Sequence, residues 1–331
     1  MIGKAFTAAV AVVVCALLVI APTTQAASVR HWKSGVFAGY GPWGDEAFAT
    51  WRGAPVQTAT DYLESADWHQ IEDPAWDIRA WREAPSIQPV LSIPMWPGVG
   101  GSLAQAATGA YNGHFEAMAR RLVAGGLNSA IIRLGWEFNG PWYSWSVQNS
   151  AQAKLFAKAW RQIVGTIRRV RGEHFNFDWS LIVSSGGVNP ALAYPGDAYV
   201  SSIGMDVYDL DETAQNESAS QRWNDIVNHG YGLAWQARFA AAHQKPVSFA
   251  EWAVAYDLLD PSRGGGDDPS FVRNMYDWFA SHDTAFENYF DADPGLTGFG
   301  LSDYGLTTGN GLFTASAALY RSLYSGSTYS P

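Results

Sequence analysis

Residues 129–170 have the sequence SAIIRLGWEFNGPWYSWSVQNSAQAKLFAKAWRQIVGTIRRV, which contains one complete strand–loop–helix unit. The apolar run Ser129–Leu134 predicts a strand, and the apolar residues of Ser150–Val170 recur at helical spacing. Arginines near the end of that stretch, followed by Gly172, are typical of a helix C-terminus. An apolar strand followed by a helix indicates a parallel sheet that is covered on both faces.

The same alternation continues along the rest of the chain. The eight predicted strands are Gly35–Gly39, Pro55–Ala59, Ile87–Ile93, Ser129–Leu134, Phe177–Val183, Val200–Met205, Pro246–Ala250 and Leu296–Leu301. The helices predicted besides Ser150–Val170 are Gly113–Ala124, Ser218–Ala242, Pro269–Ser281 and Thr314–Ser325. Eight such units in one domain favour an α/β fold with a single closed (β/α)8 TIM barrel. An open doubly wound sheet is the alternative, because periodicity does not show closure.

The first 27 residues have the pattern of a secretory signal peptide. Lys4 precedes the apolar stretch Ala5–Pro22, and small residues follow up to Ala27. We therefore expect a signal peptide at 1–27, one catalytic domain at 28–331, and secretion, either outside the cell or into a periplasm. The only cysteine, Cys15, lies in this leader, so the mature chain should contain no disulfide.

The charge of the chain narrows its possible partners. The formal net charge is −10, and it becomes −11 once the leader with Lys4 is removed. Such a surface argues against nucleic acid and anionic membranes as partners. The chain also has 16 Trp, 15 Tyr and 16 Phe. These rings either line a site for flat apolar ligand faces, such as those of sugars, or pack a large barrel.

Two glutamates follow strands at the end of the barrel where active sites lie. Glu137 follows the fourth predicted strand, and Glu251 follows the seventh. On a barrel of about 7 Å radius, side chains from these two strands leave a gap of about 5 Å between their carboxyl groups. This spacing fits a retaining glycosidase better than an inverting one, which needs about 6.5–9.5 Å. A pair of buried acids that stabilise the barrel through an arginine is the structural alternative.

The surroundings of the two glutamates suggest different roles. Glu137 lies between Trp136 and Phe138, so desolvation should raise its pKa and suit it to be the general acid/base. Glu251 would be the nucleophile and needs donors that stabilise its charge. We expect Arg133 and Tyr208 near it, although Arg133 could equally be a structural ion-pair partner.

These motifs resemble glycoside hydrolase family 26, whose members are retaining β-glycanases, often mannanases, of a large clan of barrels. Residues that match the family pattern after strand 4 are Arg133, Glu137, Asn139, Gly140, Trp142 and Trp145. The resemblance implies that Glu137 is the acid/base, that Glu251 is the nucleophile, and that Tyr208 hydrogen-bonds the nucleophile. Trp136 stands where the family usually has histidine, and Tyr304 is the nearest match to a tryptophan that often follows strand 8.

Further residues of the strand ends are candidates for substrate contact. The predicted substrate-binding residues are Arg133, Trp136, Asn139, Trp142, Trp145, Tyr208, Trp252, Trp96, Tyr40 and Tyr304. The seven histidines have no metal-ligand spacing, so we expect no catalytic metal, and we expect no cofactor. Asp267 and Asp268 follow three glycines and are expected to cap the next helix.

The sequence therefore predicts a secreted, monomeric, retaining endo-β-glycoside hydrolase that acts on a polysaccharide of β-mannan or β-glucan type. Two alternatives remain at this stage. A carbohydrate-binding protein could use the same barrel and aromatic residues without catalysis. A transglycosylase that acts on a microbial envelope glycan would use the same two glutamates.

Overall fold

The computed structural model describes residues 29–98, 100–184, 186–210, 217–260, 262–292, 302–307 and 311–330. The predicted signal peptide at 1–27 and the predicted strand Leu296–Leu301 lie outside the described residues. None of the helices in the described ranges combines the length and the apolar character that crossing a lipid bilayer requires.

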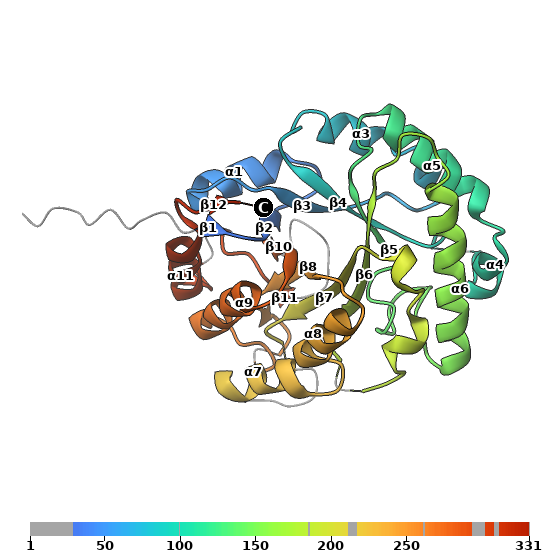
Figure 1. Cartoon of the computed structure of the whole chain (residues 1–331). Helices are drawn as coiled ribbons and strands as arrows, with labels where there is room; N and C mark the ends of the chain where they lie inside the picture. Colours follow the sequence, from blue (N-terminus) through green and yellow to red (C-terminus); the bar gives the residue numbers. More distant parts are fainter. Residues whose placement is uncertain are drawn as a thin grey trace, which may run out of the picture.

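Eight parallel strands close into a barrel, and helices surround it (Figure 1). The barrel strands are β2 (Lys33–Phe37), β3 (Thr58–Tyr62), β4 (Gln88–Ile93), β5 (Ile131–Leu134), β6 (Asn176–Ile182), β7 (Ser202–Tyr208), β8 (Val247–Ala253) and β10 (Thr284–Phe290). Strand β10 pairs with both β8 and β2, which closes the sheet. The predicted (β/α)8 fold is confirmed, and the open sheet is excluded.

Seven of the eight barrel strands overlap their predicted ranges, and the eighth does not. The last barrel strand is β10, whereas the sequence pattern suggested Leu296–Leu301. The interior of β10 contains Glu287 and Asn288, which interrupt the apolar run that marks a buried strand. Both side chains are fully buried and hydrogen-bonded, so the strand tolerates them.

The helices occupy the outer layer of the barrel (Figure 1). They are α1 (Trp43–Arg52), α2 (Trp68–Glu72), α3 (Ala75–Trp81), α4 (Leu103–Thr108), α5 (Asn112–Ala124), α6 (Ser150–Ile167), α7 (Ala219–Asn228), α8 (Leu233–Ala242), α9 (Pro269–Ser281) and α11 (Thr314–Tyr324), with the short 3₁₀ helices η1 (Pro190–Ala193) and η2 (Asp197–Tyr199). The predicted helix Ser218–Ala242 is in fact α7 and α8. The chain breaks between them at Gly230, whose positive φ of 44° a helix does not allow.

Four short strands of the described residues lie outside the barrel. Strand β1 (Val29–Arg30) pairs in parallel with β12 (Thr328–Tyr329), so the first and last described segments lie side by side. Strand β9 (Tyr256–Asp257) pairs antiparallel with β11 (Ser302–Asp303). Both members of the β9–β11 pair follow strands of the barrel, and they extend its carboxyl end.

The predicted capping aspartates do cap helices. The side chain of Asp268 accepts hydrogen bonds from the amides of Ser270 and Phe271 at the start of α9. The neighbouring Asp267 accepts from the amides of Ala315 and Ser316 at the start of α11, both at 2.7 Å. Two consecutive aspartates therefore satisfy orphan donors of two helices that lie next to each other, each contributing typically about 1 kcal/mol.

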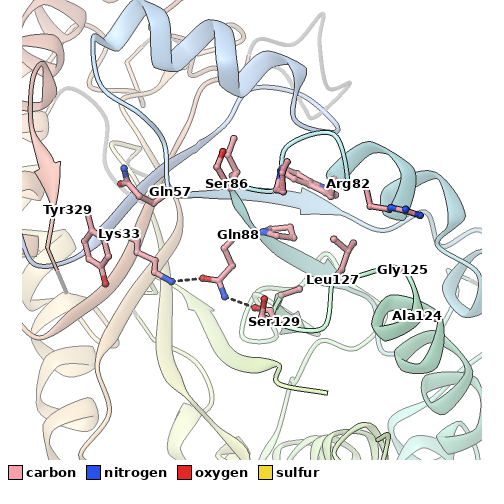
Figure 2. Close-up of a pocket in the computed structure, with 16 residues that line it drawn as sticks. Lys33, Gln57, Arg82, Ser86, Gln88, Ala124, Gly125, Leu127, Ser129 and Tyr329 are labelled. Carbon is pink, nitrogen blue, oxygen red and sulfur yellow. Dashed lines mark hydrogen bonds between the residues drawn. The ribbon is translucent and has the colours of Figure 1, made fainter. Parts of the chain in front are cut away.

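A large cavity lies at the amino ends of the strands, away from the predicted site (Figure 2). Its volume is about 740 Å³, and the starts of β2 and β4 form part of its wall. Across it, Lys33 Nζ donates to Gln88 Oε1 at 2.6 Å, and Gln88 Nε2 donates to the carbonyl of Ser129. None of the predicted site residues lines this cavity. The site is therefore to be sought at the opposite end of the barrel.

Candidate active site

The loop after β5 turns sharply to present Glu137 to the barrel mouth. Gly135 has φ of 54° and Glu137 has φ of 48°, a left-handed conformation that residues other than glycine rarely adopt. Two hydrogen bonds hold this turn: the Gly135 amide donates to the carbonyl of Ile93, and the Glu137 amide donates to that of Ser180 at 3.1 Å. Strands β4 and β6 thus fix the strained backbone of Glu137, as is common at functional sites.

Glu251 lies in β8 and is held by three donors. Tyr62 Oη donates to Glu251 Oε1 at 2.5 Å, and Arg133 Nη1 donates to the same oxygen at 2.5 Å. The hydroxyl of Tyr208 donates to the other oxygen, Oε2. Hydrogen bonds of this kind favour the ionised form of a carboxylate. The geometry agrees with the expectation that Arg133 and Tyr208 lie beside Glu251.

A third carboxyl group belongs to the same cluster. Asp206 in β7 pairs with Arg133 Nη2, so one guanidinium joins Asp206 and Glu251. One oxygen each from Glu137, Asp206 and Glu251 lies within 4.8 Å of the other two. Burial raises the pKa of Asp206 well above its usual value, against the opposing effect of Arg133. These three carboxylates could ligate a cation by spacing, but Arg133 already supplies a positive charge between two of them.

The pKa of Glu137 is raised from 4.5 to about 7. Burial of the carboxyl group is the main cause, and the charge of Glu251 adds to it, whereas Arg133 opposes it. The indole of Trp142 donates from Nε1 to Glu137 Oε2 at 2.7 Å and also lowers this pKa. At neutral pH, a substantial fraction of Glu137 is therefore protonated and able to donate a proton.

The distance between the two glutamates limits the chemistry they can perform. Carboxylate oxygens of Glu137 and Glu251 approach within 4.8 Å. Retaining glycosidases hold their pair about 5–5.5 Å apart, whereas inverting enzymes need about 6.5–9.5 Å to admit a water molecule. The spacing of these two oxygens is closer to that of a retaining pair than to that of an inverting pair.

A groove beside the carboxylate cluster follows the carboxyl ends of β6 and β7. Its volume is about 180 Å³, and Trp142, Asp206 and Tyr208 line the end near the cluster. Arg222 and His229 line the other end. Asp206 belongs to both the groove and the cluster, so a ligand in the groove would lie beside the carboxyl groups.

Several predicted aromatic residues lie at this mouth. Trp142 is 47% exposed and Tyr40 is 43% exposed, so both offer a ring to a ligand. Tyr304 packs beside Tyr208, with ring centroids 4.8 Å apart. Trp136 is nearly buried, and its Nε1 donates to the hydroxyl of Tyr143 at 2.9 Å. Of these four rings, Trp142 and Tyr40 are the most accessible.

Three predicted contact residues are buried and have other roles. Trp252 is fully buried, because it follows Glu251 in the strand and points away from the barrel interior, where it donates to Glu287. Trp96 is 1% exposed and packs against Tyr111. The prediction of sugar contact is wrong for both. It is also wrong for Trp145, which is 4% exposed.

Trp145 and Asn139 stabilise the loop after β5. Trp145 is 4% exposed, and its Nε1 donates to the carbonyl of Trp136. The amide group of Asn139 both donates to and accepts from the backbone of Ile182, at 2.7 and 2.9 Å. The Asn139 contacts tie the Glu137 loop to β6, and Asn139 also lines the groove beside the carboxylate cluster, so its predicted sugar contact stays a prediction.

Sequence reasoning missed two residues that the fold brings to the site. Tyr62 ends β3 and binds Glu251, but the predicted second strand stopped at Ala59 and left it in a loop. Tyr143 lies in the tryptophan-rich loop, where its hydroxyl accepts from Trp136 and its ring stacks on Trp145. A strand prediction extended by three residues would have put Tyr62 at the mouth.

Retaining glycoside hydrolases use a similar arrangement, a parallel barrel with two carboxyl groups about 5 Å apart at its mouth. Residues 114–241 match the model of "Glycosyl hydrolase family 26". That range includes Arg133, Glu137 and Tyr208, while Glu251 lies beyond it. The resemblance predicted from the motifs is confirmed, and the chain is glycoside hydrolase family 26-like.

Characterised relatives point to the same group of proteins. A mannan endo-1,4-β-mannosidase of Bifidobacterium adolescentis is 28% identical over 163 residues, which are 48% of this chain and 16% of the relative. Endoglucanase H of Acetivibrio thermocellus is 29% identical over 126 residues, or 36% of this chain and 13% of the relative. The matched segments thus span less than a fifth of the length of either relative.

The fold is also shared with solved structures. The catalytic domain of a family 26 endo-β-1,4-mannanase from Bacillus sp. JAMB-750 superposes with a TM-score of 0.60 at 16% identity. The superposition covers 89% of this chain and 86% of the other. At this identity the likeness supports the barrel fold.

Proposed function

We propose that the chain is a secreted, retaining endo-β-glycoside hydrolase that cleaves a β-mannan or β-glucan. The observation that carries the proposal is the contrast between Glu251, which accepts hydrogen bonds from Arg133, Tyr62 and Tyr208, and Glu137, whose pKa is raised to about 7. Hydrogen-bond donors thus surround one carboxyl group, while the other keeps its proton more readily than usual.

In the first step, Glu251 attacks the anomeric carbon of the bound sugar. Glu137 gives its proton to the glycosidic oxygen as the bond to the leaving sugar breaks. A covalent glycosyl ester forms on Glu251. As the negative charge of Glu251 is transferred into the new bond, Arg133 keeps its pairing with Asp206, so its charge is not left unpaired.

In the second step, Glu137 acts as a base. Having lost its proton, it takes one from a water molecule, which attacks the anomeric carbon and releases Glu251. Two inversions leave the product in the β configuration. The indole of Trp142 bonds Glu137 and stabilises its ionised form in this step.

The choice of glycan rests on the relatives. One is named for cleavage of mannan and the other is an endoglucanase, so both β-mannan and β-glucan are candidates. Trp136 replaces the histidine of the family pattern next to the acid/base, which changes the surroundings of the cleaved bond. We therefore keep both glycans in the proposal.

Secretion is the part of the proposal that rests on the leader alone. Residues 1–27 have the charge, apolar stretch and small residues of a signal peptide. Mass spectrometry of the protein recovered from the culture medium, or from a periplasmic fraction, should find an N-terminus close to Ala27. Full-length protein retained in the cytoplasm would contradict this part.

Hydrolysis of a glycan panel tests the activity. Wild type, Glu137→Ala and Glu251→Ala are incubated with β-mannan, β-glucan, xylan and bacterial envelope glycans, and products are followed by mass spectrometry and anomeric NMR. We expect wild type alone to release β-configured oligosaccharides from mannan or glucan. Products joined to other sugars instead of water would indicate a transglycosylase. Equal binding by all three proteins without cleavage would indicate a carbohydrate-binding protein.

A further inference from the structure

We infer that Trp43 and Trp76 form a second binding surface at the rim of the barrel, which holds sugar units of the glycan chain beyond the unit that reacts. We call these two residues the rim pair. The inference rests on the proposed function and deepens it, because it makes the preferred substrate a long chain instead of a short oligosaccharide.

The rim pair lies at the same end of the barrel as the two glutamates. Trp43 is the first residue of α1, directly after the loop that leaves β2. Trp76 is in the first turn of α3, after the segment that leaves β3. Both residues therefore belong to connections at the carboxyl ends of adjacent strands, which is where barrel enzymes bind their substrates.

Both indoles are exposed to solvent in a way that is unusual for tryptophan. The exposed fraction is 53% for Trp43 and 37% for Trp76, and their ring centroids lie 5.8 Å apart. Among the described residues, the only other exposed tryptophan is Trp142, which bonds Glu137. Exposed aromatic clusters on a soluble protein mark binding surfaces, and a planar ring is suited to the apolar face of a pyranose.

The loop beneath the rim pair is held in place before any ligand binds. The amide of Gly41 donates to Asp61 Oδ2, which also accepts from Trp81 Nε1 at 2.8 Å. Gly41 has φ of 72°, and a Cβ there would lie 2.6 Å from the ring of Trp43. Only glycine fits this position, so the backbone and the indole are packed against each other. A rigid surface loses little entropy on binding.

The indole of Trp43 has a further constraint. Its Nε1 donates to Glu83 Oε2 at 3.2 Å, and Glu83 lies just beyond α3. This bond and the edge contact with Trp76 fix the orientation of the ring. The two connections that carry the rim pair are thereby joined to each other as well as to the barrel.

Aromatic side chains link the rim pair to the nucleophile. Tyr40, in the same loop as Trp43, lies with its ring centroid 6.5 Å from that of Tyr62. Tyr62 in turn donates to Glu251. An exposed ring therefore stands between the rim pair and the carboxylate that attacks the sugar. This continuity favours one extended sugar chain as the occupant over a separate protein partner.

Chain-length dependence of the kinetics tests the inference. The probes are soluble glucomannan and 4-nitrophenyl β-disaccharides of mannose and glucose, with Trp43→Ala, Trp76→Ala and wild type. We expect KM for glucomannan to rise about tenfold in each variant, the typical loss for a binding-site tryptophan, while kcat/KM for the cleaved disaccharide stays unchanged. Trp43→Phe, which keeps a ring, should recover most of the polymer affinity.

Affinity electrophoresis through gels containing glucomannan provides a readout that needs no turnover. Wild type should be retarded, and both alanine variants should be retarded less. Val29→Ala, at an exposed position before the first barrel strand, is the control and should migrate like wild type. If wild type is retarded but cleaves no glycan, the proposed hydrolase function is wrong. The retardation of the variants then still tests whether the rim pair binds the glycan chain.

Two results would overturn the inference. If both alanine variants keep the wild-type KM for glucomannan and are retarded as much as wild type, the rim pair does not contact the glycan chain. If kcat/KM falls equally for the disaccharide and for the polymer, the tryptophans act by stabilising the structure of the barrel mouth.

Discussion

Two buried clusters of arginine, glutamate and tyrosine occur in this barrel, and only one of them is suited to catalysis. The mouth cluster consists of Tyr62, Arg133, Glu137, Asp206, Tyr208 and Glu251. The wall cluster lies between the barrel wall and the helices α1 and α11. Its members are Arg30, Arg52, Glu287, Tyr320 and Tyr324. All five members of the wall cluster are fully buried.

The charges of the two clusters are opposite. In the mouth cluster, three carboxyl groups share one arginine, so at least one of them keeps its proton more easily than usual. In the wall cluster, the single carboxyl group of Glu287 lies near two arginines and accepts from Trp252. The guanidinium of Arg30 lies 5.4 Å from the ring centroid of Tyr324, and Arg52 bonds Tyr320.

The difference teaches that a buried Glu–Arg pair is not by itself a sign of function. What distinguishes the mouth cluster is an excess of acid, a strained backbone at Glu137 and a groove lined by its members Asp206 and Tyr208. The wall cluster is fully buried, and its two arginines outnumber its one carboxyl group. Matched substitutions in the two clusters should therefore affect different properties.

The largest effect is expected at Glu251. The Glu251→Gln variant should lose turnover by on the order of 10⁴-fold or more, because the amide cannot form the glycosyl ester. The matched Glu287→Gln variant should keep the kcat of wild type and lose about 1–3 kcal/mol of stability. Steady-state kinetics on the cleaved glycan and urea unfolding measure both. Equal losses of kcat would contradict the distinction between the clusters.

The next effect concerns the tyrosine that sequence reasoning missed. The Tyr62→Phe variant removes a hydrogen bond to the charged Glu251, so kcat should fall about 10- to 100-fold. In the wall cluster, Tyr320→Phe should change thermal stability only. A Tyr62→Phe enzyme with wild-type kcat would mean that Arg133 and Tyr208 hold the nucleophile without it.

The pH dependence of activity should reflect Glu137. Because its pKa is about 7 and the protonated form is the acid, kcat/KM should fall about tenfold for each pH unit above that value. Trp142→Phe removes a donor that lowers this pKa, so the falling limb should shift to higher pH. If the falling limb of the pH profile does not shift in Trp142→Phe, a group other than Glu137 controls that limb.

The smallest effect is on stability. The raised pKa of Glu137 means that its proton stabilises the fold below about pH 4.5, and that this contribution is lost as the pH rises through about 7. Glu137→Gln should therefore be roughly 1–3 kcal/mol more stable than wild type at pH 8 and equal to it at pH 4. Denaturant unfolding at the two pH values measures the difference. Lower stability of the variant at pH 8 would contradict the assigned pKa.

The barrel and the meeting of Glu137 and Glu251 at one mouth could be predicted from sequence because they depend on local patterns. Apolar runs located seven strands, and the position of Glu137 and Glu251 directly after two of them placed both at one mouth. Strand β10 was missed because Glu287 and Asn288 form their bonds with distant partners, Trp252 and Thr60. Hydrogen bonds between residues so far apart in the chain cannot be recognised from a short stretch of sequence.

The accessibility of the tryptophans could not be predicted either. Trp252 and Glu251 are neighbours in the sequence, yet they lie on opposite sides of β8, in the helix layer and in the mouth. Trp96 and Trp145 follow strands as Trp142 does, but the packing of their loops buries them. Proximity to a strand end predicts which residues are near the mouth, and only packing determines which rings face the solvent.

The most direct test of the assigned roles is azide rescue with the glycan that wild type cleaves. Glu251→Ala is incubated with that glycan and sodium azide, and the anomeric configuration of any glycosyl azide is determined by NMR. We predict an α-glycosyl azide, because azide would replace the missing nucleophile in a single inversion. An α-azide from Glu137→Ala, with none from Glu251→Ala, would contradict the assignment and exchange the roles of the two glutamates.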